Sequence, residues 1–140
     1  MAEGQEGPLV VDASAAVSYL DGAPAEREGT VRALESAIGR QRGILIHSVN
    51  AGETYYVLAR KHGEREAERA LTVFEELGVR IVDGDWLLAK KAARLKARHG
   101  LPYADSFAAA LVLEKEGRLL TRDHDFEAVD KLIPIIWADK

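Results

Sequence analysis

One carboxylate, Asp105, lies inside the nearly unbroken apolar run "LPYADSFAAALVL" (residues 101–113). If this run is a helix, the residues that share a face with Asp105 are all apolar, because positions three, four and seven apart lie together: Leu101, Ala108, Ala109 and Val112. A buried carboxylate is unfavourable unless it is protonated, paired or bound to a metal ion. We therefore expect Asp105 to face an opening with a ligand, or to form a salt bridge with an Arg or Lys.

Other acids stand at the ends of apolar runs or at the starts of helical segments. They are Asp12 in "PLVVD", Glu53 in "SVNAGETYY", and Asp123 and Asp125 in "RLLTRDHDF". Each also has a structural interpretation. Asp12 and Asp125 could cap helices, Glu53 could complete a capping box with Asn50, and Asp123 could be an ordinary acid of a turn.

The elements that must position these acids follow from the hydrophobic pattern. Short apolar runs predict strands at 8–12, 44–46, 79–82, 118–121 and 133–137, and helical patterns fill the segments between them. The expected helices span about 13–20, 24–42, 48–61, 64–77, 86–98 and 101–116, with a helical turn at 126–132. Alternating strands and helices indicate an α/β fold, in which a parallel sheet is covered by helices on both faces. Pro134 places the last strand at an edge.

In parallel sheets of this kind, ligands bind beyond the carboxyl ends of the strands, where the strand order reverses. We therefore expect Asp12, Glu53, Asp105 and Asp123 to converge on one rim, with Asp125 as a further candidate. Clustered carboxylates repel one another, and their hard oxygen atoms suit Mg²⁺ or Mn²⁺. Such an ion can lower the pKa of a coordinated water and offset charge on a phosphoryl oxygen. The predicted chemistry is metal-assisted hydrolysis of a phosphodiester.

Size and composition limit the classes of protein. We expect one domain at residues 8–140, preceded by a disordered lead-in at 1–7, "MAEGQEG", which is not a secretory signal. No apolar run is long enough to cross a bilayer, so no membrane partner is expected. The chain has no cysteine, which makes the cytoplasm the expected location. A net charge of −4 means that an anionic substrate would need a cation or a local basic patch.

Four segments resemble, in order and spacing, the acidic motifs of PIN-domain ribonucleases, and most closely those of VapC-type toxins from toxin–antitoxin pairs. The segments are "LVVDASAAVSYL", "SVNAGETYYVLAR", "LPYADSFAAALV" and "LLTRDHDFEAV". The resemblance runs from Leu9 to about Trp137. It implies a PIN-like three-layer sandwich with a five-stranded, mostly parallel sheet between helices. The implied activity is Mg²⁺- or Mn²⁺-dependent endonucleolytic cleavage of RNA, by a homodimer that an antitoxin silences.

Carried over by position, the resemblance assigns the catalytic and metal-binding roles to an acidic quartet: Asp12, Glu53, Asp105 and Asp123. The hydroxyl groups of Ser14 and Thr121 would support this site. Two features depart from the family pattern. Gly52 precedes Glu53 where a better helix former is common, and both Asp123 and Asp125 are available as the fourth acid.

Two questions stay open at the level of sequence. RNA could be held by Arg122, beside Asp123, or by a basic segment that is otherwise a solvated helix face: Lys90, Lys91, Arg94, Lys96 and Arg98. The alternative to the toxin is a non-catalytic or housekeeping PIN-like domain that acts through protein or RNA binding. A phosphatase with Asp12 as nucleophile is disfavoured, because Ser14 stands where such enzymes have a second Asp.

Overall fold

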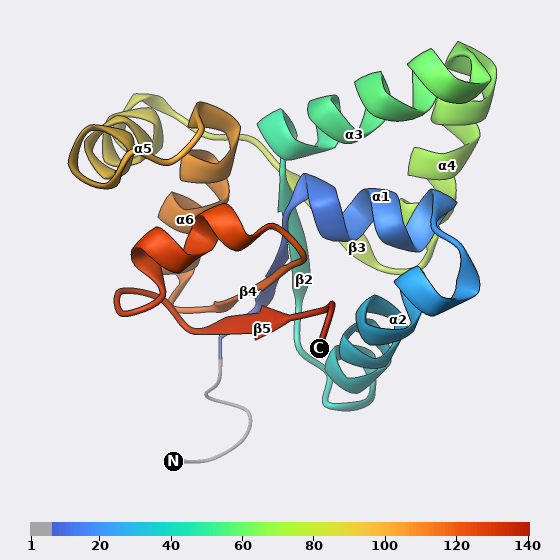
Figure 1. Ribbon diagram of the computed structural model, residues 1–140, viewed down its shortest axis with the longest axis horizontal. Coiled ribbons are helices and arrows are strands. Elements are labelled where there is room, and N and C mark those ends of the chain that lie inside the picture. The colour runs from blue at the N-terminus through green and yellow to red at the C-terminus, as the bar shows by residue number, and fades with distance from the viewer. Residues whose placement is uncertain (1–6) are drawn as a thin grey trace.

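The computed structural model describes residues 7–140, so the predicted N-terminal lead-in lies outside the described residues except for Gly7. Strands and helices alternate along the chain, as Figure 1 shows. In order, the elements are β1 (Leu9–Val11), α1 (Ala13–Asp21), α2 (Pro24–Gly39), β2 (Ile44–His47), α3 (Ser48–His62), α4 (Glu64–Glu76), β3 (Val79–Val82), α5 (Trp86–His99), α6 (Tyr103–Lys115), β4 (Arg118–Thr121), the 3-10 helix η2 (His124–Val129) and β5 (Ile135–Trp137).

The five strands form one sheet in the order β3-β2-β1-β4-β5. All four pairings are parallel, so the predicted mostly parallel sheet is parallel throughout. The strand β5 lies at one edge, as Pro134 predicts, and the carbonyl of Pro134 accepts a hydrogen bond from the amide of Leu119 at 2.9 Å. The predicted α/β fold with a five-stranded sheet is confirmed.

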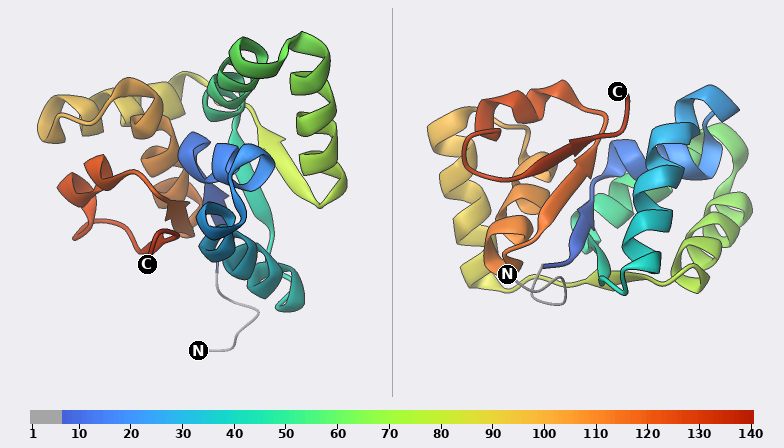
Figure 2. Two further views of the ribbon diagram at one scale, coloured as in Figure 1. Left: turned by 45° about the vertical axis from the view of Figure 1, so that its right-hand side comes forward. Right: turned by 90° about the horizontal axis from the view of Figure 1, so that it is seen from below.

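Helices cover both faces of the sheet, which gives three layers. Leu9 and Val11 pack into a core with α1, α2, α3 and α4, whereas Val10 packs into a second core with α5, α6 and η2. Successive side chains of a strand point to opposite faces, so a fully apolar strand requires both layers. Figure 2 shows the two helix layers on either side of the sheet.

The strand order reverses between β1 and β4. From β1 the chain adds β2 and β3 on one side, then crosses back and adds β4 and β5 on the other. Ligand sites of doubly wound sheets lie at such a reversal, beyond the carboxyl ends of the strands. Asp12 follows β1 directly, and Arg122 and Asp123 follow β4 directly. The topology therefore places two of the predicted acids at this position.

Some predicted boundaries are wrong by a few residues. The helix α2 ends at Gly39 instead of residue 42, and α6 begins at Tyr103, after Pro102, instead of at 101. The helix α6 is capped by Glu116, whose backbone is left-handed with φ of 53°. The next residue must be glycine for lack of space, because a Cβ added to Gly117 would lie 2.3 Å from the carbonyl oxygen of Pro8. In the described part of the chain, no helix has the length and apolarity needed to cross a membrane.

Candidate active site

Asp12 is held at the end of β1 by a network of donors. Its carboxylate accepts hydrogen bonds from the amide of Ala15 at 2.9 Å, the hydroxyl of Ser14 at 2.9 Å and the hydroxyl of Thr121 at 2.6 Å. The first of these bonds caps α1, so the capping interpretation of Asp12 is confirmed. The side chain is only 1% exposed. Its position is therefore fixed from three directions.

Thr121 connects Asp12 to the segment that follows β4. Its hydroxyl oxygen accepts a hydrogen bond from the amide of Asp123 at 2.9 Å while its proton is donated to Asp12. Ser14 adds a second link, because its hydroxyl oxygen accepts from the amide of Arg122 at 2.9 Å. The two predicted supporting hydroxyl groups thus join the carboxyl ends of β1 and β4.

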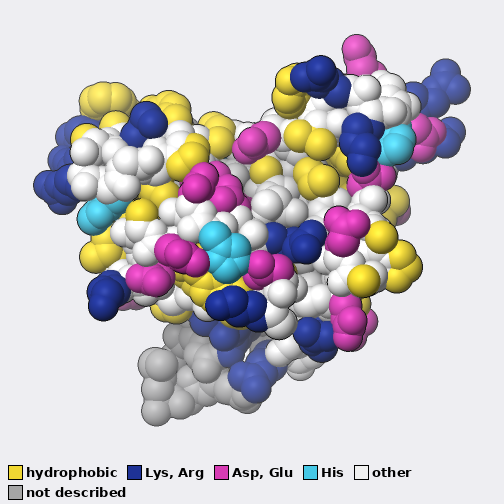
Figure 3. Space-filling view, viewed as in Figure 1, with side chains coloured by type: hydrophobic (Ala, Val, Ile, Leu, Met, Phe, Trp, Pro, Cys, Tyr) yellow, Lys and Arg dark blue, Asp and Glu magenta, His cyan; other side chains and the backbone are white. Residues whose placement is uncertain are grey.

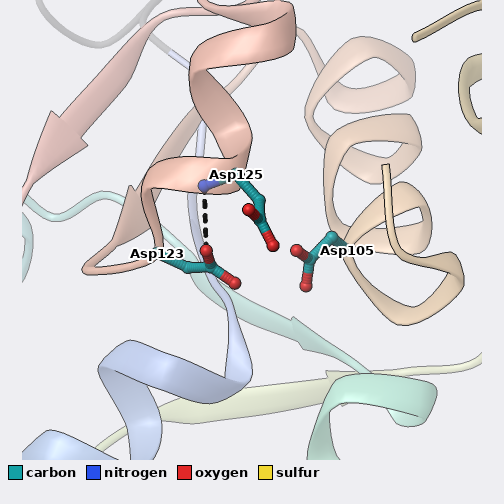
Figure 4. A group of neighbouring side chains, drawn as sticks. All are labelled: Asp105, Asp123 and Asp125. Atoms are coloured by element: carbon teal, nitrogen blue, oxygen red, sulfur yellow. Dashed lines mark hydrogen bonds between the residues drawn. The ribbon is translucent and has the colours of Figure 1, made fainter. Parts of the chain in front are cut away.

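Asp123 caps the 3-10 helix η2, because its Oδ1 accepts a hydrogen bond from the amide of Asp125 at 2.9 Å. The prediction that Asp125 itself caps a helix is wrong. The carboxylate of Asp125 is left exposed and lies near those of Asp123 and Asp105. Figure 4 shows these three side chains pointing toward one another, with the amide-to-carboxylate bond dashed.

Asp105 lies in the first turn of α6 and is 8% exposed. The residues predicted to share its face are buried, at 1% exposure or less. Within residues 7–140 no Arg or Lys forms an ion pair with it, so the salt-bridge interpretation is not supported. One of its carboxylate oxygens, Oδ2, is buried without a hydrogen-bond partner. A buried carboxylate in this state needs a proton or a cation.

The four acids of the predicted quartet line one pocket of about 260 Å³. Its other lining residues are Ala13, Ser14, Val17 and Val57. Asp12 and Asp105 form the buried side of this pocket, Asp123 is partly buried, and Glu53 of α3 is exposed. In Figure 3, acidic side chains gather in the hollow at the upper middle of the molecule. The structure therefore brings together residues that are more than a hundred positions apart in sequence.

The acidic pocket disfavours the ionised form of its buried carboxyl groups. Burial raises the pKa of Asp12 from its ordinary 3.8 to about 6, against the opposing effect of its hydrogen bonds, and the charge of Asp123 adds to the rise. Burial is also the main cause that raises the pKa of Asp105 to about 8, followed by the charges of Asp123, Asp12 and Glu53. Without a cation, the pocket therefore retains protons near neutral pH.

The donor set of the pocket fits a hard divalent cation. Asp105, Asp123 and Asp125 each offer a carboxylate oxygen, and these oxygens lie within 4.8 Å of one another. Mg²⁺ and Mn²⁺ prefer such oxygen ligands. Asp12 lines the same pocket, but its oxygens already accept several hydrogen bonds. The unpartnered Oδ2 of Asp105 is an independent sign that the pocket suits a cation.

Asn50 has a role that the sequence pattern did not predict. The helix α3 begins at Ser48, and the ring of His47 caps it, so the capping box of Asn50 and Glu53 is wrong. Asn50 is instead fully buried, accepts from the amide of Ala13 at 3.3 Å and donates to the carbonyl of Ala104 at 3.2 Å. It therefore joins the starts of α1, α3 and α6, which carry or flank the acids.

The two predicted RNA-binding groups lie on different sides of the molecule. Arg122 does not line the acidic pocket but a neighbouring one against α2, where its guanidinium lies 3.7 Å from Glu26. The basic segment of α5 packs with α6 on the opposite face of the sheet from α2, at the left of Figure 1.

Comparisons with known proteins agree with this architecture. The sequence model of the PIN domain matches residues 9–132. The VapC20 toxin from Mycobacterium tuberculosis, described as cleaving the sarcin-ricin loop, is 22% identical with a TM-score of 0.73, over 86% of this chain and 94% of that one. VapBC2 from Rickettsia felis, bound to promoter DNA, is 14% identical with a TM-score of 0.74, over 91% of this chain and 96% of that one. A toxin–antitoxin complex from Klebsiella pneumoniae is 15% identical with a TM-score of 0.70, over 93% of this chain and 97% of that one. A comparison with curated protein sequences finds no match.

Proposed function

Because the chain belongs to the PIN-domain family, we propose that it is an endoribonuclease that hydrolyses RNA phosphodiester bonds with Mg²⁺ or Mn²⁺ as its cofactor. The observation that carries this proposal is the buried acidic pocket. Four carboxylates from separate elements line it, and the pKa of Asp105 is raised to about 8. Carboxylates grouped in this way repel a polyanion unless a cation lies between them.

We assign the metal ligands to Asp105 and Asp123, with Asp12 and Asp125 as the acids that would complete the set. Bound there, the ion would supply positive charge to the phosphoryl oxygens and lower the pKa of a water molecule. The chain itself holds the carboxylates in fixed orientations. Ser14 and Thr121 hold Asp12 in one orientation, and the amide of Asp125 holds Asp123. Glu53, the exposed acid that lines the pocket, would complete the metal shell or orient a water molecule.

Cleavage of a mixed pool of single-stranded RNA tests this activity. We expect cleavage with MgCl₂ or MnCl₂, none with EDTA, and loss of cleavage in Asp12→Asn and Asp105→Asn. The matched control is Asp130→Asn, which removes the same charge from an exposed position. If either pocket variant cleaves at the rate of the wild type, the catalytic assignment is wrong.

We further propose that the protein is the toxin of a type II toxin–antitoxin pair, acts in the cytoplasm and forms a homodimer. The toxin role is supported by the similarity to VapC and VapBC structures, two of them described as a toxin–antitoxin complex or as bound to promoter DNA. The expected partner is a small antitoxin that covers the acidic pocket. The alternative is a housekeeping nuclease of the same family, without such a partner.

Growth of cells that express the chain separates the two roles. A toxin arrests growth when it is expressed alone, the Asp105→Asn variant does not, and co-expression of the product of a neighbouring short reading frame restores growth. Normal growth with fully active wild-type protein would support the housekeeping alternative. The homodimer is tested by sedimentation or light scattering of the purified protein.

A further inference from the structure

A groove of basic side chains runs between α2 and the strands β4 and β5. It consists of two adjoining hollows, of about 380 and 200 Å³, that share Gly29, Arg32 and Lys140. We call it the basic trough and define it by its five cationic residues: Arg32, Arg40, Arg118, Arg122 and Lys140. Figure 3 shows Lys and Arg side chains gathered on the lower part of the molecule, where β5 and α2 approach each other.

The charge of the basic trough contrasts with that of the whole chain. Among the described residues, five cations line it together with only two acids, Glu28 and Asp139, although the chain carries a net charge of −4. Glu28 pairs with Arg32, but their side chains are 70% and 58% exposed, and such surface pairs contribute little. Asp139 pairs with His124. The trough therefore concentrates positive charge on an otherwise acidic protein.

Two guanidinium groups in the basic trough have unmet hydrogen-bonding capacity. The Nε atoms of Arg118 and Arg122 are buried and have no hydrogen-bond partner. Because these two Nε atoms are closed to solvent, a ligand in the trough would contact the outer nitrogens of each guanidinium, and Nη1 of Arg122 already lies 3.7 Å from Glu26. Guanidinium nitrogens pair well with phosphate oxygens. This chemistry favours a phosphate-bearing ligand over an uncharged one.

The position of the basic trough links it to the acidic pocket. Arg118 begins β4 and Arg122 follows its last residue, so the trough extends along the whole strand, about 13 Å from Arg118 to Arg122 at about 3.3 Å per residue. At its upper end Arg122 is the direct neighbour of Asp123. The walls are fixed where α2 meets the chain after β5, because a Cβ on Gly29 would lie 1.8 Å from the carbonyl oxygen of Ala138.

We propose that the basic trough binds the sugar-phosphate backbone of the RNA strand on one side of the bond that is cleaved. The inference rests on the proposed ribonuclease function, since it assigns the substrate path of that same site. It also selects between two basic regions, because the basic face of α5 lies across the sheet from the trough. The ligand class is a flexible single strand, which contributes contacts through phosphates and not through base edges.

Salt dependence of RNA binding tests the proposal. The variant Arg32→Gln/Lys140→Gln removes two exposed cations shared by both hollows, and Lys91→Gln/Arg94→Gln removes two exposed cations from α5 as a matched control. The probe is a fluorescent random pool of single-stranded RNA in EDTA, which prevents metal-dependent cleavage. Each lost phosphate contact lowers the slope of log K against log salt by about 0.7. We expect the slope of the trough variant to be smaller than that of the wild type by about 1.4. Between 1 M and 0.1 M salt, the affinity of the variant should therefore rise roughly 25-fold less than that of the wild type.

The outcomes separate this proposal from the ribonuclease proposal. In Mg²⁺ the trough variant should raise KM with kcat unchanged, because it touches substrate far from the reacting bond. If the salt dependence of RNA binding is reduced in the α5 variant and unchanged in the trough variant, RNA binding by the trough is refuted. Metal-dependent cleavage would still support the nuclease in that case. Absence of RNA binding by the wild-type protein in EDTA, or binding of poly-glutamate in its place, also refutes the trough. Binding with the expected slope loss but no cleavage would refute only the nuclease.

Discussion

Replacement of Asp105 by Asn should stabilise the metal-free protein at alkaline pH and remove most of the stabilisation that magnesium gives. In the folded, metal-free protein the pKa of Asp105 is raised to about 8, mainly by burial, against an ordinary 3.8. Between these two pH values the folded state holds more protons than the unfolded state, so wild-type stability falls as pH rises through this window. The side-chain amide of the Asp105→Asn variant does not titrate, so the variant lacks this dependence on pH.

The magnitude follows from the same two values. A rise from 3.8 to about 8 corresponds to at most about 6 kcal/mol, at about 1.4 kcal/mol per pH unit. Relaxation of the pocket and entry of water reduce this, so we expect Asp105→Asn to be about 1–3 kcal/mol more stable than the wild type above pH 8 in EDTA. Near pH 4 the two proteins should differ little. Saturating Mg²⁺, at 100 times its Kd, should stabilise the wild type by about 2.7 kcal/mol and the variant far less.

Urea unfolding followed by tryptophan fluorescence, at about pH 5 and about pH 9 with EDTA or MgCl₂, measures both effects. Asp130→Asn, which changes an exposed carboxylate, should follow the wild type in every condition. The reasoning is refuted if Asp105→Asn is the less stable protein at about pH 9 in EDTA. It is equally refuted if Mg²⁺ stabilises the variant as much as the wild type.

Three further changes test the elements that support the pocket. Asn50→Ala should lower the free energy of unfolding by about 2–4 kcal/mol in urea, because two backbone groups lose their partner; a loss below about 0.5 kcal/mol would contradict the bridging role. Thr121→Val should raise the pKa of Asp12 above about 6, since the lost bond favoured the charged form. Carboxyl-carbon NMR in EDTA measures this pKa, and an unchanged value would count against the network. Gly29→Val should lower Tm and cost about 1–3 kcal/mol through its clash with Ala138, and an unchanged Tm would show that α2 can shift freely.

Most of the framework could be predicted from local pattern. The strands at 79–82 and 118–121 were predicted with the boundaries that the structure has, because β-branched and apolar residues there stand between glycine or polar breaks. The convergence of the acids was predictable as well. Carboxyl ends of parallel strands share one edge, so an acid that directly follows a strand has a predictable position.

The parts that could not be predicted depend on contacts between distant segments. Asn50 looks like a helix cap in sequence, and only the packing of α1 and α6 against α3 shows that it bridges them. Asp125 joins the acidic group because η2 begins at His124, two residues earlier than a cap at Asp125 would require, so that Asp123 is the cap instead. The basic trough draws its cations from α2, β4 and the end of the chain, which no single motif contains.

The pairing of β1 with β4 sets when the acidic pocket can exist during synthesis. Asp12 emerges from the ribosome early, but the strand that supplies Thr121 and Asp123 is among the last segments to be made. A chain stopped before residue 118 has an incomplete sheet, an Asp12 without its Thr121 donor and no partner across the strand-order reversal. Truncated products of translation therefore lack the complete pocket. The complete pocket requires β4 and the segment that follows it.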